Sequence, residues 1–204
     1  MTPYEATEQI NNVTDTDVDV FSVPVIEEPA FEADAHEAQI TGVTAERSSQ
    51  KGTPALFFHW TSRNNPLVDG VLKLWLPAAY VESGFDSKFD LSNLTDGQKI
   101  SFRINIGSSK GSALLQRLVK YATAAGRSAG DLGLTRATSL EGQAANYNAL
   151  LAGVSVIVLR VPDKDNPEYP VTNNFVAADA YETSPKTFMT KDGSPKYRLA
   201  FQSE

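Results

Sequence analysis

Alternating apolar and polar residues mark most of the chain beyond its first forty residues, and this alternation predicts β-strands. In an extended strand, successive side chains point to opposite faces. Gly42 is expected to form a bulge or bend in the first strand, and residues 186–201 predict a C-terminal hairpin around Lys191, Asp192 and Gly193. The predicted strands are 38–45, 55–62, 68–76, 99–106, 154–161 and 172–182.

Two segments repeat apolar residues at helical spacing instead. Residues 112–125 begin at Ser112, a good N-cap, and are followed by Gly126, a good residue to end a helix. Residues 140–151 predict a second helix. The order of elements predicts an α+β fold, mainly β, in which a small five-stranded barrel carries one or two helices and an added C-terminal hairpin.

The strand at 55–62 has aromatic side chains on both of its faces. We expect Leu56 and Phe58 to fill the barrel, while Phe57 and His59 face outward. Trp60 belongs to either face, depending on whether a bulge intervenes. Aromatic residues in strands mostly pack into cores, so alternation alone leaves the exposed face of each strand open.

Charge divides the chain unevenly. The net charge is −7, but residues 1–38 hold ten acidic residues and no Lys or Arg, so the remainder carries 18 basic against 15 acidic residues. We expect an acidic disordered tail at 1–36, a folded domain at 37–182 and a C-terminal extension at 183–204. The tail either recruits a partner or only aids solubility.

Several function classes lose support from the sequence. The chain has no cysteine, which excludes disulfides, thiolate nucleophiles and Cys-based zinc sites. Its two histidines, His36 and His59, have no second ligand at metal-binding spacing, and the IGSSKGS run at 106–112 lacks the Walker spacing. We therefore expect no metal, cofactor or catalytic activity, although carboxylates distant in sequence leave an enzyme as the least favoured reading. No run of apolar residues is long enough to span a membrane, and a cytoplasmic location is expected.

Aromatic and basic residues interleave along the predicted strands, and this pairing is typical of single-strand nucleic-acid binding. Rings stack on bases while cations neutralise phosphates. The candidate stacking residues are Phe57, His59, Trp60, Trp75 and Tyr169. The candidate phosphate contacts are Lys51, Arg63, Lys73, Arg103 and Arg160. A solvated charge or a core ring is the simpler explanation for any one of them.

Three segments resemble bacteriophage single-stranded DNA-binding proteins of recombination and replication modules, and the resemblance spans residues 38–182. They are SSQKG at 48–52 before an apolar strand, GSALLQRL at 111–118 leading to Gly126, and LLAGVSVIV at 150–158 followed by Tyr169 and Asn173–Val176. The resemblance implies an OB fold, a five-stranded barrel, that binds single-stranded DNA without metal or nucleotide. Two features depart from that family: the acidic tail is N-terminal, and the segment 77–110 is long.

Two hypotheses follow. The first is a phage-type protein that coats and protects single-stranded DNA in replication or recombination, in the host cytoplasm if phage-encoded. Its expected partners are the DNA, a replication or recombination protein docked on the acidic tail, and further copies in a homo-oligomer. The alternative is a non-enzymatic, β-rich phage structural or assembly protein, whose aromatic strands are core and whose tail aids solubility or assembly.

Overall fold

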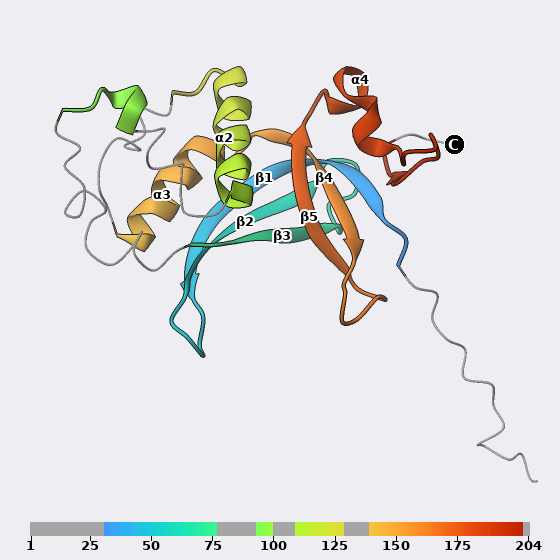
Figure 1. Ribbon diagram of the computed structural model, residues 1–204, viewed down its shortest axis with the longest axis horizontal. Helices are drawn as coiled ribbons and strands as arrows, with labels where there is room; N and C mark the ends of the chain where they lie inside the picture. Colours follow the sequence, from blue (N-terminus) through green and yellow to red (C-terminus); the bar gives the residue numbers. More distant parts are fainter. Residues whose placement is uncertain (1–30, 77–92, 100–108, 129–138, 202–204) are drawn as a thin grey trace, which may run out of the picture.

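The computed structural model describes residues 31–76, 93–99, 109–128 and 139–201 (Figure 1). Its centre is an antiparallel sheet in the order β3-β2-β1-β4-β5, with β6 parallel to β1 at one end. The strands are β1 (Asp34–Arg47), β2 (Pro54–Ser62), β3 (Asp69–Trp75), β4 (Ser155–Pro162), β5 (Pro170–Ala177) and β6 (Arg198–Leu199). The helices are α2 (Ser109–Ala124), α3 (Leu140–Leu151) and α4 (Ala180–Thr183), and a 3-10 turn, η4, covers Pro185–Phe188.

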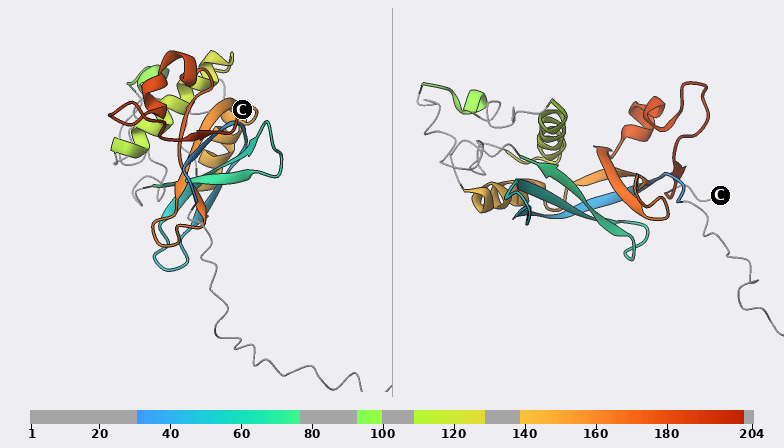
Figure 2. Two further views of the ribbon diagram at one scale, coloured as in Figure 1. Left: turned by 90° about the vertical axis from the view of Figure 1, so that its right-hand side faces the viewer. Right: turned by 60° about the horizontal axis from the view of Figure 1, so that its bottom comes forward.

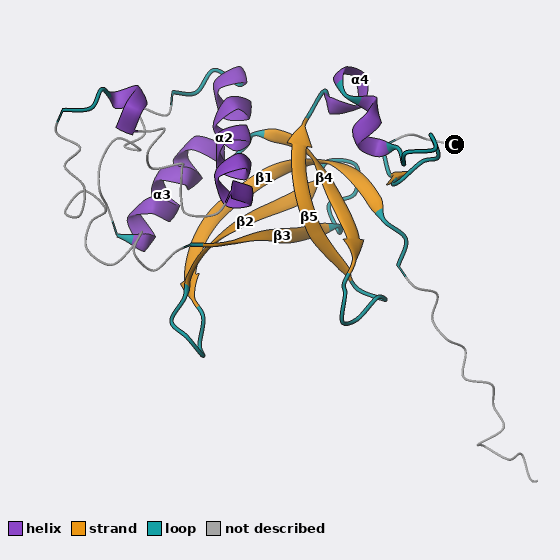
Figure 3. Ribbon diagram, in the orientation of Figure 1, coloured by secondary structure: helices purple, strands orange, loops and turns teal. Residues whose placement is uncertain are grey.

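The predicted α+β, mainly β fold is confirmed, and Figure 3 shows the strands as the scaffold on which the helices lie. In Figures 1 and 2, α3 and α4 lie at opposite ends of the sheet. None of the helices within the described residues is long and apolar enough to cross a membrane.

β1 is the organising strand because it pairs with two neighbours along different parts of its length. Residues 34–39 pair with β4, and residues 38–47 pair with β2. The register shifts between Ile40 and Gly42, so the predicted bulge at Gly42 is confirmed. The Asn148 side chain of α3 accepts a hydrogen bond from the Val43 backbone N–H at 2.9 Å, which fixes the chain just after the bulge. A bulge of this kind bends a strand, and β1 can therefore serve two parts of the sheet.

The sheet curls but does not close into a barrel. The hydrogen-bonded order runs from β3 to β5 without a ladder that joins these two end strands. One side-chain bond crosses the sheet instead: the Trp60 indole N–H donates to Thr172 Oγ1 at 2.9 Å. The described residues therefore form an open, curved sheet, and the finer prediction of a five-stranded OB-like barrel is not confirmed.

The main core lies on the inner face of this curved sheet. Leu56, Phe58 and Trp60 point inward from β2, and the leucines of α2 and α3 cover them. Trp60 fits because β3 has Gly70 opposite it: a Cβ at that position would lie 2.9 Å from the indole Cζ2. Trp60, which the sequence left on either face, is thus a core residue with 1% of its surface exposed.

Several element boundaries differ from the predictions. α2 begins at Ser109, so Ser112 lies inside the helix rather than capping it, whereas Gly126 ends the helix with a φ of 80° as predicted. β5 stops at Ala177, and the end of the predicted strand 172–182 is the helix α4. The predicted strand 99–106 lies outside the described residues, except for Lys99, which is helical together with residues 96–98.

The predicted domain boundaries also need correction at both ends. β1 begins at Asp34, and Asp34, Ala35 and His36 are buried, so the predicted tail of residues 1–36 extends three residues too far into the fold. The predicted extension at 183–204 contributes Phe188 and Tyr197 to a second core with Ala35, Ile157 and Leu159. The hairpin predicted around Lys191, Asp192 and Gly193 is present only as a turn flanked by an antiparallel bridge between Met189 and Pro195. The predicted extension therefore belongs to the folded domain.

The corrected boundary changes the charge balance. Seven of the 25 acidic residues lie within residues 1–30, so residues 31–204 hold 18 acidic and 18 basic residues. Residues 31–204 therefore carry no net formal charge, and the net charge of −7 comes from residues 1–30. Any affinity of the body for a polyanion has to come from local clusters of cations rather than from its total charge.

Candidate functional site

The second face of the β1–β2–β3 sheet, here called the outer face, carries most of the predicted binding residues. Strand register arranges its side chains in rows across the three strands, one residue from each. The rows are Glu46–Ala55–Trp75, Thr44–Phe57–Lys73, Gly42–His59–Val71 and Gln39–Thr61–Asp69. Because alternation sends Leu56, Phe58 and Trp60 inward, Phe57 and His59 face outward as predicted.

One lysine and two rings form the centre of this face, and we call them the Lys73 cluster: Phe57, Lys73 and Trp75. Lys73 Nζ lies 4.7 Å from the centre of the Phe57 ring and 4.2 Å from that of Trp75. Trp75 remains 46% exposed, which is unusual for a tryptophan. Within the described residues, no carboxylate lies within ion-pair distance of Lys73. The cluster thus offers an aromatic surface and an uncompensated positive charge.

Hollows follow β3 on both sides of this cluster. A hollow of about 300 Å³ lies toward the β1–β2 turn, between Glu46, Arg47 and Trp75. A second, of about 540 Å³, surrounds His59 and Val71. Lys73 borders the first hollow and also a third of about 400 Å³ between β3 and β5. An extended ligand lying along β3 would therefore meet a run of depressions with Lys73 at its centre.

His59 is held in place by a neighbouring strand. Its Nε2 lies 2.8 Å from Thr44 Oγ1, and the ring is half-buried on the outer face. This bond orients the imidazole, so His59 can present a fixed ring surface to a ligand.

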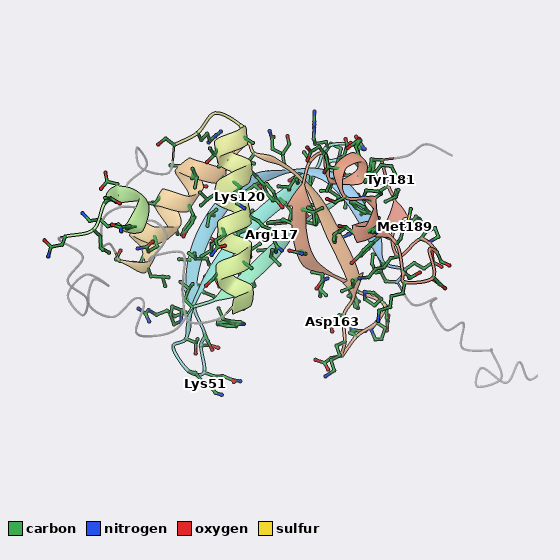
Figure 4. All side chains as sticks on the ribbon, turned by 45° about the horizontal axis from the view of Figure 1, so that its top comes forward. Lys51, Arg117, Lys120, Asp163, Tyr181 and Met189 are labelled. Carbon is green, nitrogen blue, oxygen red and sulfur yellow. The ribbon has the colours of Figure 1, made fainter. Side chains whose placement is uncertain are left out.

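Two turns project from the same side of the sheet and frame the outer face (Figure 1). Lys51 lies exposed in the β1–β2 turn, where Gly52 adopts a φ of 61° that favours glycine (Figure 4). Tyr169 is 61% exposed in the β4–β5 turn, which the Asp163 carboxylate holds by accepting bonds from two backbone N–H groups. Both predicted residues are accessible to a ligand of sufficient length.

Arg160 requires correction, because its charge is compensated within the protein. Its guanidinium donates to both carboxylate oxygens of the fully buried Asp34, at 2.8 and 2.6 Å. A third contact, of 3.0 Å, joins it to His36 Nε2. Burial by itself would raise the pKa of Asp34, but hydrogen bonds from His36 and Arg160 outweigh it and lower that pKa. Arg160 therefore stabilises the fold. Neither Arg160 nor the buried Trp60 is an exposed candidate for contact with a ligand.

Two further predicted phosphate contacts do not join the Lys73 cluster. Arg63 is exposed in the turn after β2, where its backbone N–H donates to the Glu37 carbonyl. Arg103 lies outside the described residues. The structure thus brings together Phe57, His59, Lys73 and Trp75, with Lys51 and Tyr169 on the framing turns.

Sequence reasoning missed Arg117, which lies between α2 and β5 (Figure 4). It borders a hollow of about 580 Å³ together with Lys73 and Trp75. The available signal was the composition of α2, whose residues Ser109–Ala124 include Lys110, Arg117 and Lys120 but no acidic residue. A helix with charges of only one sign indicates a surface that faces an opposite charge.

No family model matches the chain, and the comparison with curated proteins found no similar sequence. Within the described residues, no group of three or more His, Cys, Asp or Glu side chains is placed to hold a metal ion. The function proposed below accordingly rests on the chemistry of the outer face.

Proposed function

We propose that this protein binds single-stranded DNA on the outer face of β1–β2–β3, as an OB-type protein of the kind used in phage replication and recombination. The strand order supports the OB part of the proposal. An OB fold is a five-stranded, partly open barrel that binds oligonucleotides on its second and third strands and on the loops after strands one and four. Here the outward-facing rings lie on β2 and β3, and the framing turns follow β1 and β4.

The Lys73 cluster is the single observation that carries the proposal. Stacking of a base on an aromatic side chain contributes about 1–3 kcal/mol and tolerates any base, because every base has a π-face. Trp75 supplies such a surface at 46% exposure, and Lys73 supplies a charge for the adjacent phosphate. The lysine now lies against the ring, so a bound base would share the aromatic surface with it or displace it toward the phosphate.

The length of the outer face suits an extended strand of several nucleotides. The hollows beside Trp75, His59 and Val71 follow one another along β3. Lys51 and Tyr169 add a cation and a ring at the two framing turns. The body carries no net charge, so we expect modest affinity that falls steeply with added salt.

The direct test is a fluorescence anisotropy titration of labelled oligo(dT) at low salt, with the tryptophan emission recorded in parallel. Trp60 is buried and Trp75 exposed, so quenching on binding should come from Trp75. Trp75→Phe should keep most of the anisotropy rise, because it retains a ring, and should lose the quenching. No anisotropy rise with the wild-type chain at low salt would exclude the proposal.

A truncating variant measures the stacking contribution. Trp75→Ala should weaken oligo(dT) binding by about 1–3 kcal/mol, roughly 5- to 160-fold. Met189→Ala is the matched control, since it also removes an exposed apolar side chain, 45% exposed, but from the C-terminal segment. Equal affinities for the two variants would show that binding does not use Trp75.

The alternative, a non-enzymatic β-rich phage structural or assembly protein, gains some support from the neutral body and from the outer edges of β3 and β5, which pair with no further strand among the described residues. Unpaired strand edges are places where another chain can add a strand. This alternative predicts concentration-dependent assembly in light scattering together with no change in oligo(dT) anisotropy.

A further inference from the structure

The edge of β3 that faces away from β2 borders a hollow covered by α2. This hollow, of about 580 Å³, is lined by Lys73, Trp75, Arg117, Asn173 and Asn174, among others. Among its described lining side chains, two are cationic, two are amides and none is a carboxylate. The hollow also shares Lys73 and Trp75 with the outer face, so the two surfaces are continuous around the edge of β3.

Arg117 is held in this hollow with a donor to spare. Its Nη2 donates to Asn174 Oδ1 at 2.9 Å, which fixes the guanidinium against β5. Its Nε is buried and has no acceptor among the described residues. A buried donor without an acceptor costs about 1–3 kcal/mol, so a ligand oxygen that reached this Nε would remove that cost.

A β-bulge in β5 shapes the opposite wall. The pairing of β4 and β5 shifts between Leu159 and Arg160, where Leu159 pairs with Asn174 and Arg160 with Thr172. Asn173 is the extra residue, and both asparagines line the hollow. Bulges re-aim side chains in this way. Here Asn174 presents its Oδ1 to the guanidinium, and Asn173 adds a second side-chain amide to the wall of the hollow.

The surroundings favour an anion over a cation or an apolar group. Gly111, in the first turn of α2, also lines the hollow, so the positive end of the helix dipole lies on the same side as Arg117 and Lys73. A planar guanidinium with free donors matches the oxygen geometry of a phosphate.

We propose that this hollow, beneath α2 and centred on Arg117, binds a phosphate group. If the proposed function holds, on which the identity of the ligand rests, the group is a backbone phosphodiester of the DNA strand as it passes from Trp75 around the edge of β3. Arg117 binds the phosphate oxygens, Lys73 neutralises the charge from the other side, and Asn173 donates from the bulge.

The first experiment measures oligo(dT) affinity over a range of salt concentrations for four forms of the full chain: wild type, Arg117→Gln, Arg117→Lys and Lys120→Gln. Lys120→Gln is the matched control, because it removes one positive charge from the exposed surface of the same helix. Arg117→Gln should lose about tenfold in affinity at low salt and lower the salt slope by about 0.7, the value for one phosphate on a single strand. Arg117→Lys should lose less, since it keeps the charge but not the planar fork.

The second experiment observes the Arg117 Nε–H signal by ¹H–¹⁵N NMR in the wild-type protein, assigned by its absence in Arg117→Lys. Inorganic phosphate and oligo(dT) are added separately, each against sodium chloride of equal ionic strength. Both should shift the Nε–H signal, while chloride should not. This readout does not depend on whether Arg117→Gln folds, which its thermal unfolding curve reports.

The outcomes separate the two proposals. If wild type does not bind oligo(dT) but inorganic phosphate shifts the Nε–H signal, the nucleic-acid function fails and the hollow is a site for free phosphate. If oligo(dT) binds but the Nε–H signal stays in place and Arg117→Gln behaves like Lys120→Gln, the phosphate site is wrong and the binding function stands. No shift with either ligand overturns the site.

Discussion

Two clusters in this protein each combine a cation with two aromatic rings, yet they have opposite characters. In the Lys73 cluster, Lys73 lies over Phe57 and Trp75 on the exposed outer face. In what we call the Arg160 cluster (Phe31, Asp34, His36, Trp60 and Arg160), Arg160 lies over Phe31 at 5.2 Å and over Trp60 at 6.0 Å. The cation and its two rings, taken by themselves, do not distinguish the two clusters.

The two clusters differ in whether a carboxylate lies at the paired position of the neighbouring strand. Asp34 of β1 is the direct partner of Arg160 in β4, so the guanidinium is paired and largely removed from solvent. In the row of Lys73, the partners are Phe57 and Thr44, which carry no charge. A cation that meets a buried carboxylate becomes part of the fold, while one that meets only rings and a hydroxyl keeps its charge for a ligand. Residue type therefore indicates binding only when the cross-strand partner is known.

The largest expected effect tests the structural role of the Arg160 cluster. Asp34→Ala leaves Arg160 without its partner in a mostly buried position, and should lower the free energy of unfolding by about 3–5 kcal/mol. Glu46→Ala, an exposed acidic residue near the other end of β1, should change it by less than about 0.5 kcal/mol. Urea unfolding followed by circular dichroism measures both. Similar urea midpoints for Asp34→Ala and Glu46→Ala would show that the Arg160 cluster does not stabilise the fold more than an exposed charge does.

The pH dependence of stability tests whether the charge of Asp34 stabilises the fold. The pKa of Asp34 is lowered in the folded protein from an ordinary value of 3.8, so its ion pair stabilises the fold fully above about pH 4. That contribution is lost as the pH falls below this value through the folded-state pKa. In urea unfolding from pH 7 to pH 2, wild type and Asp34→Asn should differ most near neutral pH and converge in acid. A constant difference across this range would show that the charge of Asp34 is not the cause.

A smaller effect is expected for the Lys73 cluster, and in a different measurement. Lys73→Gln should reduce oligo(dT) affinity by about three- to tenfold at low salt and lower the salt slope by about 0.7, with little change in stability. Arg160→Gln should do the reverse, with lowered stability and nearly unchanged affinity. Lys196→Gln is the control, because Lys196 also lies over a ring, that of Tyr197, but in the C-terminal segment. Loss of affinity in Lys196→Gln equal to that in Lys73→Gln would indicate a general charge effect.

Alternation predicted the strands well where one face is buried. Residues 55–62 and 154–161 lie in β2 and β4 nearly as expected, and the outward positions of Phe57 and His59 follow from the period of two. The C-terminal part of the predicted strand 172–182 failed because Ala180 and Tyr181 turn into α4, which packs on the second core. The early start of β1 was missed because Asp34 and His36 look like tail residues until Arg160 is placed beside them.

The candidate site was predictable in part for the same reason. Phe57, Lys73 and Trp75 alternate along β2 and β3 with leucines and a phenylalanine. The sequence predicts that these apolar residues point inward, and their polar or aromatic neighbours outward. The meeting of Arg117 with Asn173 was not predictable, because a helix and a bulge distant in sequence come together only in the folded chain. Trp60 was left on either face because a bulge would have changed its direction. The register shift lies between Ile40 and Gly42 of β1, and Trp60 keeps the alternation of β2.

The sequence by itself determined the acidic N-terminal segment, the mainly β character and the alternation that places aromatic rings on both faces of β2. Those properties are local: they depend on composition and on neighbours two residues apart. Only the tertiary structure decided which cation is free, since that depends on whether a carboxylate more than a hundred residues away pairs with it, as Asp34 does with Arg160. Charge compensation acts through space, and a linear pattern carries no information on it until the strand register is known.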